Sequence, residues 1–140
     1  MFNYKKLYFK FVKQGGMMTK KILVADDEIH ILQIVKFNLQ KRGGYEVVTA
    51  KNGEEALELA KAEKPDLILS DVMMPKMSGF EFCEEAKKDD TLKEIPFLIL
   101  TAKGQESDLV EGEKAGVDEY ITKPFSPKSL LNKVKDILGE

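Results

Sequence analysis

Polar side chains that can bind a metal or a phosphoryl group follow the apolar runs of this sequence. Asp26-Asp27-Glu28 follows the first run, Asp71 ends another, Thr101-Ala102 ends a third, and Lys123-Pro124 follows a fourth. Taken singly, each could be a turn former or a helix cap, since Asp and Thr are common at such places. Taken together, they indicate one site built from carboxylates, a hydroxyl group and an ammonium group.

The acidic residues predict a metal site. Two carboxylates about 4 Å apart repel each other by about 4 kcal/mol at an effective dielectric constant of 20, and a bound divalent cation removes that repulsion. Asp26, Asp27 and Asp71 offer only oxygen ligands, which favours Mg²⁺ over zinc. His30 is interpreted as a solvated surface residue rather than a phosphotransfer group.

Asp71 is the candidate nucleophile, because carboxylates can form acyl phosphates. A cation that bridges Asp71 and the incoming phosphoryl oxygens would neutralise developing charge. Lys123 can pair with one phosphoryl oxygen, and the Thr101 hydroxyl can bond to another. Ala102 is small enough for its backbone N–H to be approached closely, although simple packing is an equally good interpretation.

The elements that must position these residues alternate along the chain. Short apolar or β-branched runs span 21–26, 45–50, 66–71, 95–102 and 119–122, and helical patterns follow at about 28–41, 53–63, 79–88, 105–114 and 127–138. Three runs are apolar at consecutive positions, which predicts strands buried on both faces of a parallel sheet. Five strand–helix units predict a doubly wound α/β fold, in which ligands bind beyond the carboxyl ends of the strands.

The helical segments carry their own local signals. Residues 28–41 place Ile31, Ile34, Val35 and Leu39 on one predicted core-facing side. Asn52 and Ser126 are predicted N-caps. The segment 105–114 is polar and contains Gly112, which costs about 1 kcal/mol relative to Ala inside a helix. We therefore expect this helix to pack weakly.

Composition separates a short leader from one domain. Residues 1–17 combine aromatic side chains with lysines, and we interpret them as a tag, a leader or an upstream start, the alternative being a basic amphipathic element that touches a membrane or partner helix. Residues 18–140 form the predicted domain. Beyond residue 16 there are 18 basic and 24 acidic residues, a net charge of −6, which argues against nucleic acid as the direct ligand.

The expected location is the cytoplasm. Cys83 is the only cysteine, so no intramolecular disulfide can form, and a reducing compartment fits best. No apolar run approaches the roughly 20 residues needed to span a bilayer. Lysines also interrupt the N-terminal stretch that a signal peptide would keep apolar.

Four motifs together carry a family resemblance: ILVADDE (22–28), DLILSDVMMPKMSGFE (66–81), LILTAKG (98–104) and GVDEYITKPF (116–125). In combination they resemble the receiver domain of two-component response regulators, of the single-domain type found in chemotaxis regulators. The resemblance covers residues 21–138. It implies a flavodoxin-like (βα)5 fold, with five parallel strands in the order 2-1-3-4-5 between two layers of helices.

The resemblance also implies roles at the matching positions. Asp71 is similar to the phosphorylated aspartate, which is modified in a Mg²⁺-dependent reaction. Asp27 corresponds to a direct metal ligand, Asp26 to one that helps through water, and the backbone carbonyl of Met73 to a third protein ligand. Lys123 corresponds to the phosphate-binding lysine, and its peptide bond to Pro124 is expected to be cis.

Thr101 and Tyr120 resemble the two switch residues of the family, a hydroxyl residue and an aromatic residue that couple phosphorylation to the signalling surface. Phosphorylation adds charge and acceptor oxygens, so Thr101 is expected to move toward the phosphoryl group and leave space for Tyr120 to rotate. The surface of the helix at 105–114, the strand at 119–122 and the helix at 127–138 then becomes the signalling face. Met73 and Lys103 correspond to positions that, in the family, tune hydrolysis of the acyl phosphate, and we expect slow self-dephosphorylation.

The resemblance also implies binding partners. The phosphoryl group is expected to come from a sensor histidine kinase or a phosphotransfer protein, and a downstream protein is expected to bind the signalling face. The chain is not expected to be an enzyme beyond catalysing its own phosphorylation and dephosphorylation. The sequence favours a stand-alone regulator, the alternative being a receiver fragment of a larger regulator or hybrid kinase.

Three other functions fit the sequence less well. A phosphatase of the haloacid dehalogenase class needs a second acid two residues after its nucleophile, where this chain has Met73. A nucleotide- or flavin-binding protein needs a phosphate-binding loop after the first strand, where this chain has three acidic residues. A phosphorylation-independent receiver commonly lacks an acid or the lysine, and all of them are present here.

Overall fold

The computed structural model of the protein describes residues 19–102 and 106–140. The predicted leader at 1–17 and the position of Lys103 lie outside the described residues. Five strands and five helices alternate in the described part: β1 (Lys21–Ala25), α2 (Ile29–Lys41), β2 (Glu46–Ala50), α3 (Gly53–Glu63), β3 (Leu67–Asp71), α4 (Gly79–Lys88), β4 (Phe97–Ala102), α5 (Glu106–Ala115), β5 (Glu119–Lys123) and α6 (Pro127–Leu138). Each lies within two residues of its predicted bounds at either end.

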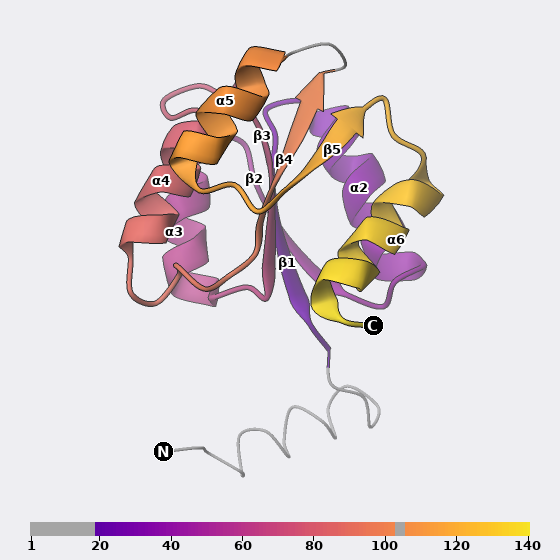
Figure 1. Ribbon diagram of the computed structural model, residues 1–140. Helices are drawn as coiled ribbons and strands as arrows, with labels where there is room; N and C mark the ends of the chain where they lie inside the picture. The colour runs from indigo at the N-terminus through magenta and orange to yellow at the C-terminus, as the bar shows by residue number, and fades with distance from the viewer. Residues whose placement is uncertain (1–18, 103–105) are drawn as a thin grey trace, which may run out of the picture.

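The strands form one parallel sheet in the order β2-β1-β3-β4-β5. Figure 1 shows α2 and α6 on one face of this sheet and α3, α4 and α5 on the other. This is the predicted flavodoxin-like (βα)5 fold with three layers. Since all strands run the same way, their carboxyl ends share one edge, where the polar residues of the sequence collect.

Both faces of the sheet are buried, as the consecutive apolar runs predict. Successive residues of β1 alternate between two core clusters: Ile22 and Val24 pack toward α2 and α6, and Leu23 and Ala25 pack toward α3 and α4. All four are fully buried. The central strands are therefore held from both sides, which fixes the ends that carry the site.

The helix ends follow the predicted capping signals. The Asn52 side chain accepts a hydrogen bond from the Glu55 N–H at 2.8 Å, and the Ser126 side chain accepts one from the Ser129 N–H at 3.0 Å. Ser78 forms a reciprocal capping box with Glu81 at the start of α4. Such caps satisfy backbone donors that have no partner within the helix.

The predicted buried side of α2 is partly wrong. Leu32, Val35, Asn38 and Leu39 are buried, whereas Ile34 is 55% exposed. Positions 32, 35 and 39 share one helix face at a period of 3.6 residues, and Ile34 lies about 100° away from Val35. Ile31 is partly buried against the same cluster.

Candidate functional site

Two neighbouring strands position the acidic residues. Asp71 is the last residue of β3, and Asp26 follows β1, which pairs with β3. The Asp26 N–H donates to the Ala50 carbonyl at 3.1 Å, which extends the ladder to β2 by one residue. The sheet therefore fixes the backbone of both carboxylates at the same edge.

Three carboxylates converge at this edge. Asp26, Asp27 and Asp71 each have a carboxylate oxygen within 4.8 Å of those of the other two. Asp26 is fully buried, 13% of the Asp71 side chain is exposed, and Asp27 is exposed. The group is thus buried at one side and open to solvent at the other.

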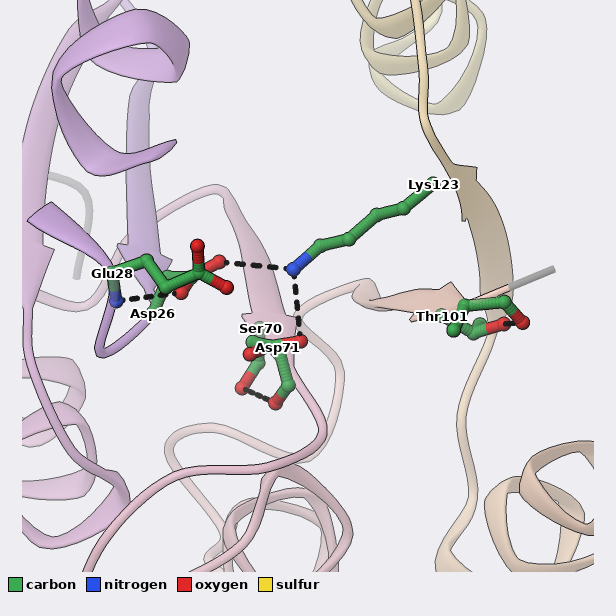
Figure 2. Close-up of polar contacts among 7 residues, drawn as sticks. Asp26, Glu28, Ser70, Asp71, Thr101 and Lys123 are labelled. Atoms are coloured by element: carbon green, nitrogen blue, oxygen red, sulfur yellow. Dashed lines mark hydrogen bonds and ion pairs between the residues drawn. The ribbon is translucent and has the colours of Figure 1, made fainter. Parts of the chain in front are cut away.

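Lys123 joins two of these acids from across the site, as Figure 2 shows. Its ammonium group lies 3.1 Å from Asp71 Oδ1 and 3.3 Å from Asp26 Oδ2. The other Asp26 oxygen accepts a hydrogen bond from the Glu28 N–H at 2.9 Å. The peptide bond between Lys123 and Pro124 is cis, as expected.

Burial and mutual repulsion set the acid–base properties of the cluster. Burial raises the pKa of Asp26, and the neighbouring Asp71 charge raises it further, although the Glu28 N–H and Lys123 oppose the change. Burial also raises the pKa of Asp71, against the attraction of Lys123. Burial alone would lower the pKa of Lys123, but Asp71 and Asp26 outweigh it and raise the pKa. One ammonium group therefore only partly compensates this concentration of negative charge.

The cluster opens into a cleft of about 490 Å³. Its lining includes the ion-paired residues Asp71 and Lys123, together with Met73 and Ala102 from the sequence prediction. It also includes Glu28, which the sequence placed at this edge without a role, and Asp108, which the prediction did not assign to the site. Two apolar residues, Val72 and Leu100, complete the lining. Asp108 lies in the first turn of α5, and the start of a helix that follows a parallel strand always faces the ligand edge. The place of Asp108 in the first turn of the helix after β4 is therefore the sequence feature that could have identified it as a site residue.

Two hydrogen bonds and the close approach of α4 fix the backbone around Asp71. The Ser70 hydroxyl donates to the Asp71 carbonyl at 2.9 Å, and the Gly79 N–H donates to the Val72 carbonyl at 2.8 Å. A β-carbon on Gly79 would lie 2.1 Å from the Asp71 carbonyl oxygen. Only glycine allows α4 to begin this close to the strand end.

Thr101 and Tyr120 are not brought into the charged cluster. The buried Thr101 hydroxyl donates to the Ala102 carbonyl at 3.1 Å, and Figure 2 shows this residue apart from the carboxylates and Lys123. The Tyr120 hydroxyl donates to the Leu109 carbonyl of α5 at 3.3 Å. Each hydroxyl group is therefore bonded to a backbone carbonyl and not to a carboxylate of the cluster.

The residues at this edge fit a hard divalent cation. The ligand atoms on offer are carboxylate oxygens, and two of the three carboxylates have their pKa raised by burial, so a cation would relieve an existing electrostatic cost. The one cysteine of the chain, Cys83, is buried and donates to the Ala115 carbonyl, so it offers no softer ligand here.

Among the residues that the structure describes, no helix has the length and apolar character to cross a membrane.

Curated proteins are similar to this chain in sequence. The Alkaline phosphatase synthesis transcriptional regulatory protein PhoP of Bacillus subtilis (strain 168) is 50% identical over 121 residues, which are 86% of this chain and 49% of that protein. The chain spans about half the length of the curated relatives it matches.

Two solved structures share the fold across nearly their whole length. A putative response regulator from Chloroflexus aurantiacus J-10-fl has a TM-score of 0.82 and 34% identity, covering 87% of this chain and 99% of that one. The chemotaxis response regulator CheY4 of Vibrio cholerae has a TM-score of 0.80 and 39% identity, covering 85% and 98%. The family description "Response regulator receiver domain" matches residues 22–135. The chain therefore belongs to the receiver-domain family of two-component response regulators.

Proposed function

We propose that this receiver domain takes a phosphoryl group from a phosphohistidine onto Asp71 and uses it as a reversible switch. The observation that carries the proposal is the pairing of Asp71 with Lys123 at 3.1 Å, beside Asp26 and Asp27, in an open cleft. The cleft thus offers a carboxylate that can act as nucleophile, an ammonium group that can pair with phosphoryl oxygens, and further carboxylates that can bind a metal ion.

The reaction follows from the positions of these groups. An oxygen of the Asp71 carboxylate attacks the phosphorus atom, and an acyl phosphate bond forms. The phosphorus–nitrogen bond of the donor breaks, and its electron pair leaves with the histidine nitrogen. Lys123 pairs with a phosphoryl oxygen. Ala102 also lines the cleft, and its backbone N–H would donate to the same group.

Asp26, Asp27, Asp71 and the backbone carbonyl of Met73 would hold Mg²⁺. When bound, this ion supplies neutralisation of the charge that develops on the phosphoryl oxygens. Asp27 is the exposed acid of the three and is the proposed direct ligand, whereas the fully buried Asp26 acts through water.

Output depends on α5, β5 and α6 in this proposal. Thr101 turns from the Ala102 carbonyl to a phosphoryl oxygen, and Tyr120 moves into the space that it leaves. Leu109 and Val110 of α5 are 48% and 56% exposed, so α5 has little apolar packing to resist a shift. A downstream protein recognises the altered face.

The chain acts on itself alone in this proposal, as acceptor of the phosphoryl group and as catalyst of its own phosphorylation and dephosphorylation. Because the curated relatives are about twice its length and are named as transcriptional regulators, a second candidate is a receiver within a longer transcriptional regulator. In that case nucleic acid would be bound by another part of the protein.

Intact mass tests the proposal directly. After incubation with acetyl phosphate and Mg²⁺, we expect the mass to rise by one phosphoryl group in the protein and in Asp90→Asn, a control at an acid whose side chain is 92% exposed. The gain should be absent in Asp71→Asn. An equal gain in Asp71→Asn would contradict the proposal.

The lifetime of the acyl phosphate is a separate prediction. Met73 is 78% exposed and lines the cleft, so its apolar side chain can shield the phosphorus atom from attacking water. We expect a lifetime of minutes or longer, with Met73→Asp shortening it by admitting water. Loss of the label within seconds in the unaltered protein would show that hydrolysis is not slowed.

A further inference from the structure

Gly112 lies inside α5 and faces Tyr120 of the neighbouring strand β5. A β-carbon on Gly112 would lie 2.0 Å from the Tyr120 hydroxyl oxygen and 2.8 and 2.9 Å from two of its ring carbons. The same hydroxyl donates to the carbonyl of Leu109, three residues earlier in α5. The tyrosine ring therefore occupies the space where any other residue at 112 would place its side chain.

The backbone does not explain this glycine. Gly112 is helical and does not have a positive φ, unlike Gly116, whose φ of +93° ends the helix in the left-handed region. The Gly112 carbonyl accepts from the N–H groups of Gly116 and Val117 at 3.0 and 2.9 Å, and alanine would make the same bonds. A helix-interior glycine is otherwise unfavourable, so the contact with the ring is the remaining reason for it.

Tyr120 and Thr101 lie on the same face of the sheet. Tyr120 pairs with Ile99 of β4, and Thr101 follows Ile99 by two residues, so its side chain points to the same side. Residues at such diagonal positions are within reach of an aromatic side chain. If Thr101 turns from the Ala102 carbonyl toward a phosphoryl group, as the proposed function requires, the ring can move on that face into the space that Thr101 leaves.

We infer that Gly112 is a positioning residue. Because it has no side chain, it leaves room on α5 for the Tyr120 ring, and we call this space the seat. Gly112 thereby sets the balance between this ring position and the one next to Thr101. The seated ring coincides with a Thr101 hydroxyl turned to the Ala102 carbonyl. The seat itself rests on geometry alone, and its effect on phosphorylation rests on the proposed function. A side chain at 112 expels the ring and shifts the population toward the other arrangement.

A thermal double-mutant cycle tests the seat without any phosphoryl group. In the Tyr120→Ala background, Gly112→Ala meets no ring and should raise Tm by about 3–6 °C through helix propensity alone. In the unaltered background the same substitution should lower Tm or leave it unchanged. An equal rise in both backgrounds would overturn the inference, as would loss of folding in both. Failure of Gly112→Ala alone to fold, with the double variant folded, would support it.

The effect on the switch is measured with beryllofluoride, an analogue of the phosphoryl group, in the presence of Mg²⁺. Gly112→Ala should bind it at least about fivefold more tightly than the unaltered protein. Tyr120→Ala and the double variant should bind it equally. Equal affinity of Gly112→Ala and the unaltered protein would overturn the link to the switch. Absence of binding in every variant would instead count against the proposed function, and the thermal cycle would still decide whether the seat exists.

Discussion

At the scale of single residues, the charge cluster is built for binding rather than for stability. Asp26 is fully buried beside Asp71, and Lys123 supplies one positive charge to both. Because burial raises the pKa of both acids, their ionised forms cost stability at neutral pH. Replacing one charge with a neutral group of the same shape should therefore stabilise the fold.

Asp26→Asn tests this cost. The asparagine oxygen can still accept from the Glu28 N–H, and we expect the free energy of unfolding to rise by about 1–2 kcal/mol at pH 7 in EDTA, since Lys123 already offsets part of the repulsion. A raised folded-state pKa means that the penalty appears as pH rises through that pKa and is absent below the unfolded value of 3.8. The gain should therefore vanish below about pH 4. Asp90→Asn should show no gain at either pH, and a loss of stability in Asp26→Asn at pH 7 would contradict the argument.

Cys83 should be chemically inert in the folded protein. Burial raises the pKa of its thiol to about 12, and the thiol donates to the Ala115 carbonyl. Since the thiolate is the reactive form, we expect no reaction with Ellman's reagent at pH 8 and release of one equivalent after unfolding in guanidinium chloride. Rapid labelling under native conditions would show that α4 opens readily.

The sequence predicted the residue types of the site better than their orientations. Strand ends place Asp26, Asp71 and Lys123 at one edge whatever their rotamers, so their proximity followed from the order of elements. The direction of the Thr101 hydroxyl depends on a side-chain torsion and on the nearby Ala102 carbonyl, which no pattern along the chain encodes. The position of Asp108 depends on where α5 begins.

At the scale of elements, the prediction that failed in part was which side of α2 is buried. Both Leu32 and Ile34 are apolar, and a helix with apolar residues around much of its circumference has more than one plausible buried side. The packing against α6 decides it, because the Asn38 side chain donates to the Pro127 carbonyl at 2.8 Å and turns that face inward. A tertiary contact therefore settles what periodicity alone leaves open.

The start of α4 should control the position of Asp71. Gly79→Ala would force its β-carbon against the Asp71 carbonyl, and we expect a loss of about 1–3 kcal/mol in stability and a slower phosphorylation rate with acetyl phosphate. Ser78→Ala is the matched control, because it removes the neighbouring cap at a cost of about 1 kcal/mol without crowding Asp71. Equal phosphorylation rates in the two variants, at temperatures where both are folded, would argue against this role.

At the scale of the whole molecule, the sequence indicated the layered α/β architecture from residue patterns alone. Runs such as Leu67–Leu69 are apolar at every position, and the structure buries them on both faces of the sheet. The residue patterns did not predict the strand order, because alternating strands and helices are compatible with several orders. The order 2-1-3-4-5 came from the resemblance carried by the motifs, and the sheet confirms it.

Metal binding should stabilise the fold as a whole. A cation held by Asp26, Asp27 and Asp71 binds the folded chain only, so Mg²⁺ at 100 times its Kd should add about 2.7 kcal/mol to the free energy of unfolding. Differential scanning fluorimetry with and without EDTA measures the shift. Asp27→Asn should lose most of it and Asp90→Asn should keep it; an identical shift in both would place the ion elsewhere.

The most direct measurement is the site of the phosphoryl group. Borohydride reduces an aspartyl phosphate to homoserine, and tandem mass spectrometry then reads the modified position in a peptide. After treatment with acetyl phosphate and Mg²⁺, we predict homoserine at position 71 and at no other aspartate of the cluster. Homoserine at position 26 or 27, or an unmodified residue 71 in protein that has gained a phosphoryl group, would contradict the central claim.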